Sequence, residues 1–320
     1  TELATRRAVA KCINATIDSI PGLVVGAADL TGNTGVKLDD GTDQSATHPE
    51  GRQVHYGIRE HAMAGTMNGM ALHGGIVPVG GTFFVFSDYM RPSVRLAALS
   101  NAHVIYSWTH DSVGLGEDGP THQPIEQLAA MRAMPNLRVI RPADANETAH
   151  AWRIAMDSDG PTGLVLSRQS LPVLEGTADA AEGVARGGYV LAATSETPDV
   201  VLVGTGSEVH VCLGAMKVLA ESSEEQTVGA RVVSLPSWDL FAAQDDSYQE
   251  SVLPSDVPTL AVEAAASLGW ERYADDSVTI DHFGASAPGA TVLDKFGFNP
   301  ENVAARARNL LSEMRTRRTP

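Results

Sequence analysis

The residues best suited to chemistry lie in the run 109–122, which holds two histidines, two aspartates and one glutamate in 14 positions. Histidine titrates near pH 6.5, so it can transfer protons or donate hydrogen bonds to hydroxyl and phosphate groups. Metal binding is the rival interpretation, since histidine and aspartate are metal ligands, although their spacing here matches no zinc motif. Backbone-restricting residues indicate a shaped loop: Gly114, Gly116, Gly119 and Pro120.

Glu60 begins a helix-like segment rich in small residues, including Ala64, Gly65 and Gly69. An acid in a first helical turn complements the helix dipole, and the residue types alone favour this structural role. The alternative is a buried carboxylate with a raised pKa, which would suit proton exchange. The small residues also allow a close helix pair or a subunit interface.

Phe83, Phe86 and Tyr89 recur at intervals of three and share one face of a helical turn. Such a stripe usually belongs to a core. Aromatics make up only 5% of the chain, however, so a stacking surface for a heteroaromatic ring is the alternative. Arg6 and Arg168 have side chains that can clamp a phosphate bidentately, although surface salt bridging is the default role for each.

Short apolar runs alternate with helix-period segments, and these elements must position the residues above. Strands are expected over 24–28, 76–79, 103–108, 137–140 and 163–167. Helices are expected over 58–72, 89–99, 125–134 and 146–156. Pro142 and Asp144 give a start signal for the last of these helices. The alternation predicts right-handed crossovers and a mostly parallel sheet covered on both faces.

The pattern stops near residue 172 and resumes after an acid-, Ala- and Gly-rich stretch. Further strands are expected over 200–203, 231–235 and 259–263, with helices over 208–219 and 302–314. We therefore expect an α/β protein with two three-layer αβα domains and mostly parallel sheets. The domains would span 1–172 and 188–320, joined by a linker over 173–187.

Ligands bind at the carboxyl ends of strands in open parallel sheets. The loops at those ends are unusually polar or glycine-rich: 29–35, 80–83, 109–122 and 168–169. Residues 204–208, Gly-Thr-Gly-Ser-Glu, also follow an expected strand. A lone Gly-x-Gly favours a tight turn before a helix over a phosphate cradle.

Composition excludes several classes. The chain has 320 residues, 43% of them hydrophobic and 19% charged, so it can bury a sizeable core. A net charge of −16 argues against nucleic-acid and anionic-membrane partners. Cys12 and Cys212 are too few and too far apart for a disulfide framework. Without a long apolar run or a signal peptide at residues 1–11, the expected location is cytoplasmic.

Several segments resemble transketolase in the same order along nearly the whole chain. They are YGIREHAM at 56–63, TFFVFSDY at 82–89, THDSVGLGEDGPTHQP at 109–124, LSRQ at 166–169 and GTGSEV at 204–209. The third segment is highly specific. The resemblance implies a thiamine-diphosphate-binding-fold pyrimidine domain followed by a transketolase C-terminal domain. It favours functional over structural roles for Glu60 and the aromatic stripe.

The resemblance implies transfer of a two-carbon ketol unit from a ketose phosphate, such as xylulose 5-phosphate. The acceptor would be an aldose phosphate, ribose 5-phosphate or erythrose 4-phosphate, as in the pentose phosphate pathway. Thiamine diphosphate would act as the electron sink. Glu60 would hydrogen-bond its aminopyrimidine ring, and Phe83, Phe86 and Tyr89 would form the ring pocket. Asp29 would be a further cofactor contact.

The resemblance also assigns substrate residues. His110 and His122 would contact substrate hydroxyls or phosphate and assist proton transfer, as catalytic residues beside Glu60. Asp118 would read the stereochemistry of the α-hydroxyl. Arg6 and Arg168 would hold the sugar phosphate. Asn33 would join this phosphate shell where the family often has serine, because an amide still donates a hydrogen bond.

One family feature is missing from the sequence. Transketolases begin with a diphosphate-binding domain whose Gly-Asp-Gly motif and downstream Asn hold Mg²⁺, or Ca²⁺, and the cofactor's diphosphate. No Gly-Asp-Gly occurs here, so we expect no metal ligands in this chain. We expect inactivity without that domain or a subunit supplying it, and a homodimer or heterotetramer with it. The helix-like start at Thr1 would mark the seam.

Two other readings stay open. The chain could belong to another thiamine-dependent enzyme: dihydroxyacetone synthase, 1-deoxyxylulose-5-phosphate synthase or the β subunit of a 2-oxoacid dehydrogenase. His110, Asp118, His122 and Arg168 favour a sugar-phosphate enzyme over the last of these. A non-catalytic scaffold that keeps the fold is the third reading, against which the retention of Glu60 speaks.

Overall fold

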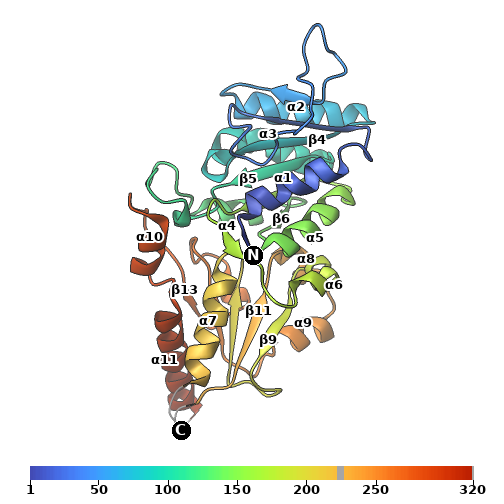
Figure 1. Cartoon of the computed structure of the whole chain (residues 1–320). Coiled ribbons are helices and arrows are strands. Elements are labelled where there is room, and N and C mark those ends of the chain that lie inside the picture. The colour runs from blue at the N-terminus through green and yellow to red at the C-terminus, as the bar shows by residue number, and fades with distance from the viewer. Residues whose placement is uncertain (222–226, 319–320) are drawn as a thin grey trace.

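A computed structural model of the protein describes residues 1–221 and 227–318. Within these residues the long strands form two sheets, and helices pack on both faces of each (Figure 1). A short antiparallel pair, β1 Glu2–Leu3 with β8 Leu171–Pro172, ties the first residues to the segment that follows the first sheet. The expected architecture of two three-layer αβα units is confirmed.

Six parallel strands form the first sheet, in the order β3-β2-β4-β5-β7-β6. Their bounds are β2 Leu23–Ala27, β3 Gln53–His55, β4 Val77–Phe83, β5 Ile105–Thr109, β6 Arg138–Ile140 and β7 Thr162–Leu166. β5 and β7 are buried at every position, as expected of parallel strands covered on both faces. The carboxyl ends of all six strands meet at one edge of the sheet.

Successive strand residues point to opposite faces and separate two cores. On one face, Ile105 packs in a cluster with α1 Thr5–Thr16 and α5 Ala145–Met156. On the other, Tyr106 packs with α2 Glu60–His73, α3 Ser87–Ser100 and α4 Gln127–Arg132. The predicted start of α5 is confirmed, because Asp144 accepts a hydrogen bond from the Glu147 amide at 2.8 Å.

The second sheet has five strands in the order β13-β12-β10-β11-β9, with only β9 antiparallel. The strand bounds are β9 Tyr189–Ala193, β10 Val200–Gly204, β11 Ala230–Ser234, β12 Thr259–Val262 and β13 Asp276–Val278. α7 Glu208–Ala220 and α11 Pro300–Arg318 cover one face, with α10 Gly289–Lys295 beyond them. α8 Trp238–Ala242 and α9 Asp246–Val252 cover the other.

Every strand and helix expected from the apolar pattern is present, with ends shifted by a few residues. The pattern missed the short elements β3, β9, β13, α8, α9 and α10. The stretch expected to be a linker is folded: it contains α6 Ala181–Ala185, and Thr177 donates a hydrogen bond to Asp144 at 2.6 Å. The expected domain limits stay a prediction.

Candidate active site

Loops at the carboxyl edge of the first sheet bring four candidate residues together. Arg6, in the first turns of α1, donates from Nη1 to the Asn33 carbonyl at 2.9 Å. Asn33 lies in the loop after β2, and Arg168 follows β7. Arg6 and Arg168 both act electrostatically on His110, the residue that follows β5. The structure therefore brings these four residues together, and their role as a phosphate shell stays a prediction.

His110 is held in an unusual conformation. Its φ of 60° lies in the left-handed region, which a non-glycine residue seldom adopts. Its ring is 3% exposed and stacks on Phe83 with centroids 3.6 Å apart, and Nδ1 lies 2.9 Å from the Thr109 hydroxyl. Burial, with the charges of Arg6, Arg168 and His122, lowers the pKa of His110 to about 3. The imidazole is therefore neutral near pH 7.

The aromatic stripe is a stack that runs from the interior to solvent. Phe83 ends β4 and stacks with Phe86 at 5.9 Å, and Phe86 stacks with Tyr89 of α3 at 5.7 Å. His122 packs edge-on against Phe83 and Phe86, with centroid distances of 6.2 and 5.4 Å. Tyr89 is 66% exposed. The structural interpretation of the stripe as core is therefore wrong at its outer end, where an aromatic face remains open for stacking.

Glu60 begins α2 and is 7% exposed. Its carboxylate makes no hydrogen bond or ion pair with any residue that the structure describes. A buried carboxylate without a partner is costly, so this side chain is suited to receive a polar group from outside the chain. Neighbouring α3 packs closely on α2, with Asn68 donating to the Ser93 carbonyl at 2.8 Å.

Asp29 and Asp118 stand apart from this cluster. Asp29 follows β2 with a φ of 62° and is exposed. Asp118 is exposed in the loop after β5. In the described part of the chain, neither carboxylate has a hydrogen bond or ion pair with the other candidate residues. Their predicted roles remain predictions.

A cavity of about 520 Å³ opens beside Arg6 and Asn33. Arg7, Lys11 and Lys37 also line it, so positive charge dominates locally in a chain with a net charge of −16. Burial, then Arg7 and Arg168, lowers the pKa of Arg6. An anionic ligand would relieve the repulsion among these arginines. The net negative charge of the chain opposes this little, because charges beyond a Debye length are screened and those within a cleft dominate.

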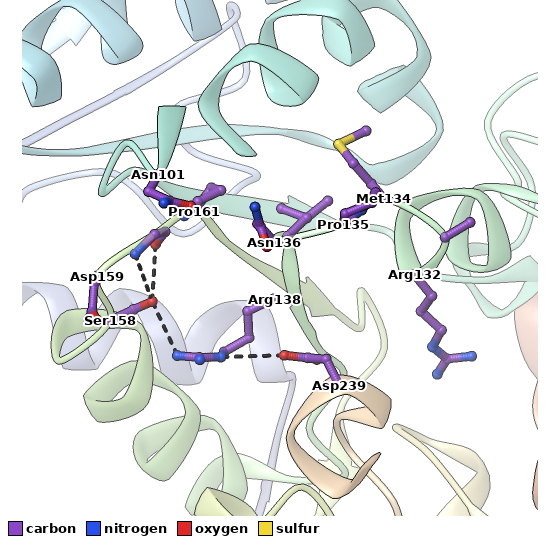
Figure 2. Close-up of a pocket in the computed structure, with 13 residues that line it drawn as sticks. Asn101, Arg132, Met134, Pro135, Asn136, Arg138, Ser158, Asp159, Pro161 and Asp239 are labelled. Atoms are coloured by element: carbon purple, nitrogen blue, oxygen red, sulfur yellow. Dashed lines mark hydrogen bonds and ion pairs between the residues drawn. The ribbon is translucent and has the colours of Figure 1, made fainter. Parts of the chain in front are cut away.

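A second cavity, of about 500 Å³, lies at the opposite edge of the sheet (Figure 2). It adjoins the amino ends of β6 and β7, the edge at which parallel sheets seldom bind ligands. Figure 2 shows Arg138 between Ser158 and Asp239, to which it lies at 3.2 and 3.5 Å. Its charge is already paired within the protein, so we place the candidate active site at the carboxyl edge.

No described group of three His, Cys, Asp or Glu residues is arranged to hold a metal ion. The helices within residues 1–221 and 227–318 are all too short or too polar to cross a bilayer.

Sequence reasoning missed two buried residues, Asp111 and its partner Arg141. Asp111 lies next to His110 in the acidic loop, and Arg141 Nε donates to Asp111 Oδ2 at 3.0 Å. The only sequence signal was the clustering of acids in residues 109–122.

Arg141 packs into the 204–208 turn, where a Cβ on Gly206 would lie 2.8 Å from its guanidinium. That turn is therefore a tight helix entry filled by an arginine, not a phosphate cradle.

The fold and this edge define the class: a mostly parallel α/β protein of two αβα units, with aromatic and cationic side chains gathered at the strand-end loops of the first sheet. Residues 1–173 match the family model described as "Transketolase, pyrimidine binding domain". Residues 187–299 match the "Transketolase-like TK C-terminal domain". The chain belongs to the transketolase family.

Individual relatives support the same family assignment. A transketolase of Halalkalibacterium halodurans is 51% identical over 97% of this chain and 47% of its own length. A Pichia stipitis transketolase in complex with sedoheptulose 7-phosphate superposes with a TM-score of 0.94 at 41% identity, covering 99% of this chain and 47% of that one. This chain thus spans about half the length of the relatives it matches.

One solved structure is of similar length. It is described as a split gene transketolase, inactive beta4 tetramer, and has 26% identity and a TM-score of 0.79. The match covers 97% of this chain and 99% of that one.

Proposed function

We propose that the chain is the C-terminal portion of a transketolase and transfers a two-carbon ketol unit between sugar phosphates. The donor would be a ketose phosphate such as xylulose 5-phosphate, and the acceptor ribose 5-phosphate or erythrose 4-phosphate. One observation carries the proposal: His110 joins the aromatic stack, through Phe83, to the cationic group of Arg6 and Arg168. A heteroaromatic cofactor and a sugar phosphate would thus be held side by side.

The residues present fit a thiamine pyrimidine ring. The open face of Tyr89 continues the Phe83–Phe86 stack, and the Glu60 carboxylate is buried without a partner among described residues. Thiamine diphosphate, when bound, supplies the electron sink for cleavage of the carbon–carbon bond beside the donor carbonyl. Glu60 would hold a proton at the ring, and Asp29 would lie near the cofactor. Mg²⁺ and the diphosphate belong to a separate diphosphate-binding domain.

The histidines would orient the sugar. A neutral His110 has one N–H donor and one acceptor nitrogen, so it can bind a hydroxyl or a phosphate oxygen without adding charge. His122, edge-on to the stack, would assist proton transfer at the reacting carbons. Asp118, in the same loop, would read the α-hydroxyl. The phosphate would lie against Arg6, Arg168 and Asn33, and the sugar-phosphate complex of the Pichia stipitis relative supports this substrate class.

A partner is part of the proposal. The chain covers 47% of the Halalkalibacterium halodurans transketolase, and the split-gene relative of similar length is described as inactive. We infer that this chain is inactive until a diphosphate-binding domain or subunit joins it, in a homodimer or a heterotetramer. We place the activity in the cytoplasmic pentose phosphate pathway.

The test is reconstitution. The chain is mixed with a diphosphate-binding domain carrying Gly-Asp-Gly, thiamine diphosphate and Mg²⁺, and ketol transfer from xylulose 5-phosphate to ribose 5-phosphate is followed. Transfer is expected in the mixture and not with the chain alone. A mixture that assembles but transfers no ketol would refute the proposed function.

The role of Glu60 has its own variant. Glu60→Ala should leave the mixture nearly inactive, because the only carboxylate proposed to hydrogen-bond the pyrimidine ring is removed. Glu175→Ala, an exposed acid outside the site, is the matched control and should retain parental activity. Full activity of Glu60→Ala would contradict the role.

A further inference from the structure

A buried group of charges, which includes Asp111 next to His110 in the chain, joins the two units. Arg141, which follows β6, is 1% exposed. Its Nε and Nη2 lie 3.0 and 2.9 Å from Asp111 Oδ2. Its Nη1 donates to Glu208, at the start of α7 in the second sheet, and to the Thr205 hydroxyl at 2.9 Å. One arginine therefore connects the substrate-side loop to the C-terminal unit.

The second unit is shaped around this arginine. Gly206 has a φ of 53°, and a Cβ there would lie 2.8 Å from Arg141 Cζ. The Gly206 amide donates to the Arg141 carbonyl at 3.1 Å. Burial by itself lowers the pKa of Arg141, but the Glu208, Asp111 and Glu263 carboxylates together raise it. The Gly-Thr-Gly-Ser-Glu turn thus binds a permanently charged guanidinium.

This connection acts on the backbone of His110. Thr109 is fixed by strand pairing of β5 with β4 and β7. Asp111 is fixed by Arg141. His110 lies between them at a φ of 60°, a conformation that persists only where the surroundings hold it. Two anchors therefore flank the strained residue: the pairing of β5 within the first sheet, and Arg141, which Glu208 and Thr205 of the second unit bind in turn.

Further contacts from the second unit brace the same loop. Gln123 donates to the Ala285 carbonyl at 3.0 Å, and Ser286 donates to the Glu117 carbonyl at 2.6 Å. α10 packs on the turn Val113–Leu115 that follows Asp111, as the placement of α10 beside the green loop indicates (Figure 1). The C-terminal unit thus holds the loop after β5 at several points.

We propose that Arg141 is a positioning residue for the transketolase reaction: bound by Glu208 of the C-terminal unit, it holds Asp111 and thereby fixes His110 facing the sugar phosphate. A buried ion pair is weak evidence for stability, because apolar residues of similar volume often serve as well. The ion pair of Arg141 is connected instead to the strained His110, so its role is to position that residue. The inference rests on the proposed function, and it assigns to the C-terminal unit the positioning of the substrate loop.

The variants are chosen so that the chain stays folded. Arg141→Ala would leave the buried Asp111 and Glu208 carboxylates without their ion-pair partner. Glu208→Gln and Asp111→Asn are therefore used, since each keeps the side-chain shape. Asp239→Asn is the matched control. Asp239 also forms an ion pair between the two units, with Arg138 at 3.5 Å (Figure 2). Within the described residues it makes no hydrogen bond or ion pair with the loop after β5.

The first measurement compares xylulose 5-phosphate with unphosphorylated xylulose in the reconstituted mixture. In Glu208→Gln and Asp111→Asn, KM for the phosphorylated sugar should rise about tenfold or more, the loss expected when a hydrogen bond to a charged group is removed. KM for xylulose should change less than about twofold, as should both constants in Asp239→Asn. Equal shifts for the two sugars, or no shift, would overturn the positioning role.

The second measurement uses the chain without its partner. Hydrogen exchange of the Gly114, Leu115 and Gly116 amides, which bond to Ser112 and Val113, should be about tenfold faster in both variants. Protection of β10 should be unchanged, which reports that the fold is intact. Parental exchange rates would overturn the proposal. If the unsubstituted mixture transfers no ketol, the proposed function fails, while this measurement still tests whether Arg141 holds the loop after β5.

Discussion

At the residue scale, the chemistry of the site depends on the charge of His110. Its ring is buried against Phe83, and the charges of Arg6 and Arg168 oppose a third positive charge beside them. A protonated imidazole would add to the phosphate-binding charge. A neutral one instead contributes directional hydrogen bonds and leaves electrostatic binding to the arginines.

The lowered pKa of His110 predicts a pH-dependent stability. The unfolded chain binds a proton near pH 6.5, whereas the folded chain binds it only near pH 3. Between these values the unfolded state holds more protons, so the free energy of unfolding falls as the pH falls. From pH 7 to pH 5 the parent should lose ~2 kcal/mol more than His110→Asn, measured by urea unfolding. The exposed His73→Asn variant should follow the parent, and parallel curves for parent and His110→Asn would contradict the lowered pKa.

Arg168 supports a second prediction, made in the reconstituted mixture. Arg168→Ala should raise KM for xylulose 5-phosphate by about tenfold or more and lower kcat much less, because a charge-assisted contact to a distant phosphate contributes binding that is uniform along the reaction. Arg153→Ala removes an exposed arginine paired with Asp157 and should change neither constant. An unchanged KM in Arg168→Ala would argue against the phosphate assignment.

The sequence identified the members of the site cluster and missed the residues that position them. Residue type, spacing and resemblance to transketolase predicted His110, Phe83 and Arg6, which the structure brings together. Arg141 is separated from Asp111 by 30 positions. Its pairing depends on the fold of both units, and nothing in its sequence neighbourhood distinguishes a buried arginine from a surface one.

At the element scale, prediction succeeded where burial is continuous. β5 and β7 are buried at all five positions each, so the apolar run itself marks a parallel strand. β3 and β13 have three residues each and include exposed or half-buried polar positions. Such strands exist because they extend a sheet that is already formed, and this non-local pairing leaves no periodic pattern in so few residues.

The turn before α7 gives the prediction at this scale. Gly206→Ala should lower the free energy of unfolding by about 1–3 kcal/mol, because the new methyl group would strain a left-handed position and press on Arg141. Gly32→Ala, where no atom lies within 4 Å of the added Cβ, is the control. Urea unfolding at equilibrium measures both, and equal stability of the two variants would contradict the packing described for Arg141.

At the scale of the whole molecule, one face is unsuited to lasting contact with water. Large apolar side chains are exposed at the start of α2 and along α2 and α3: Ile58, Leu72, Leu96 and Leu99. Small residues between them, such as Gly65 and Gly69, leave the backbone accessible. An exposed apolar patch marks a contact surface, and here it lies on the helices that carry Glu60 and Tyr89. Assembly and completion of the site would then use the same face.

This face predicts self-association through α2 and α3. The chain alone should sediment as a dimer or larger, because association would bury these apolar side chains. Leu72→Asp combined with Leu99→Asp should yield the monomer, because two carboxylates would lose their hydration on association. Leu268→Asp alters a leucine that is 71% exposed in the second unit and should leave the mass unchanged. Sedimentation velocity over a range of concentrations measures the mass of each variant.

A monomeric parent, or a double variant with the parental mass, would exclude these helices as the interface and leave Glu60 to be covered by the diphosphate-binding partner alone.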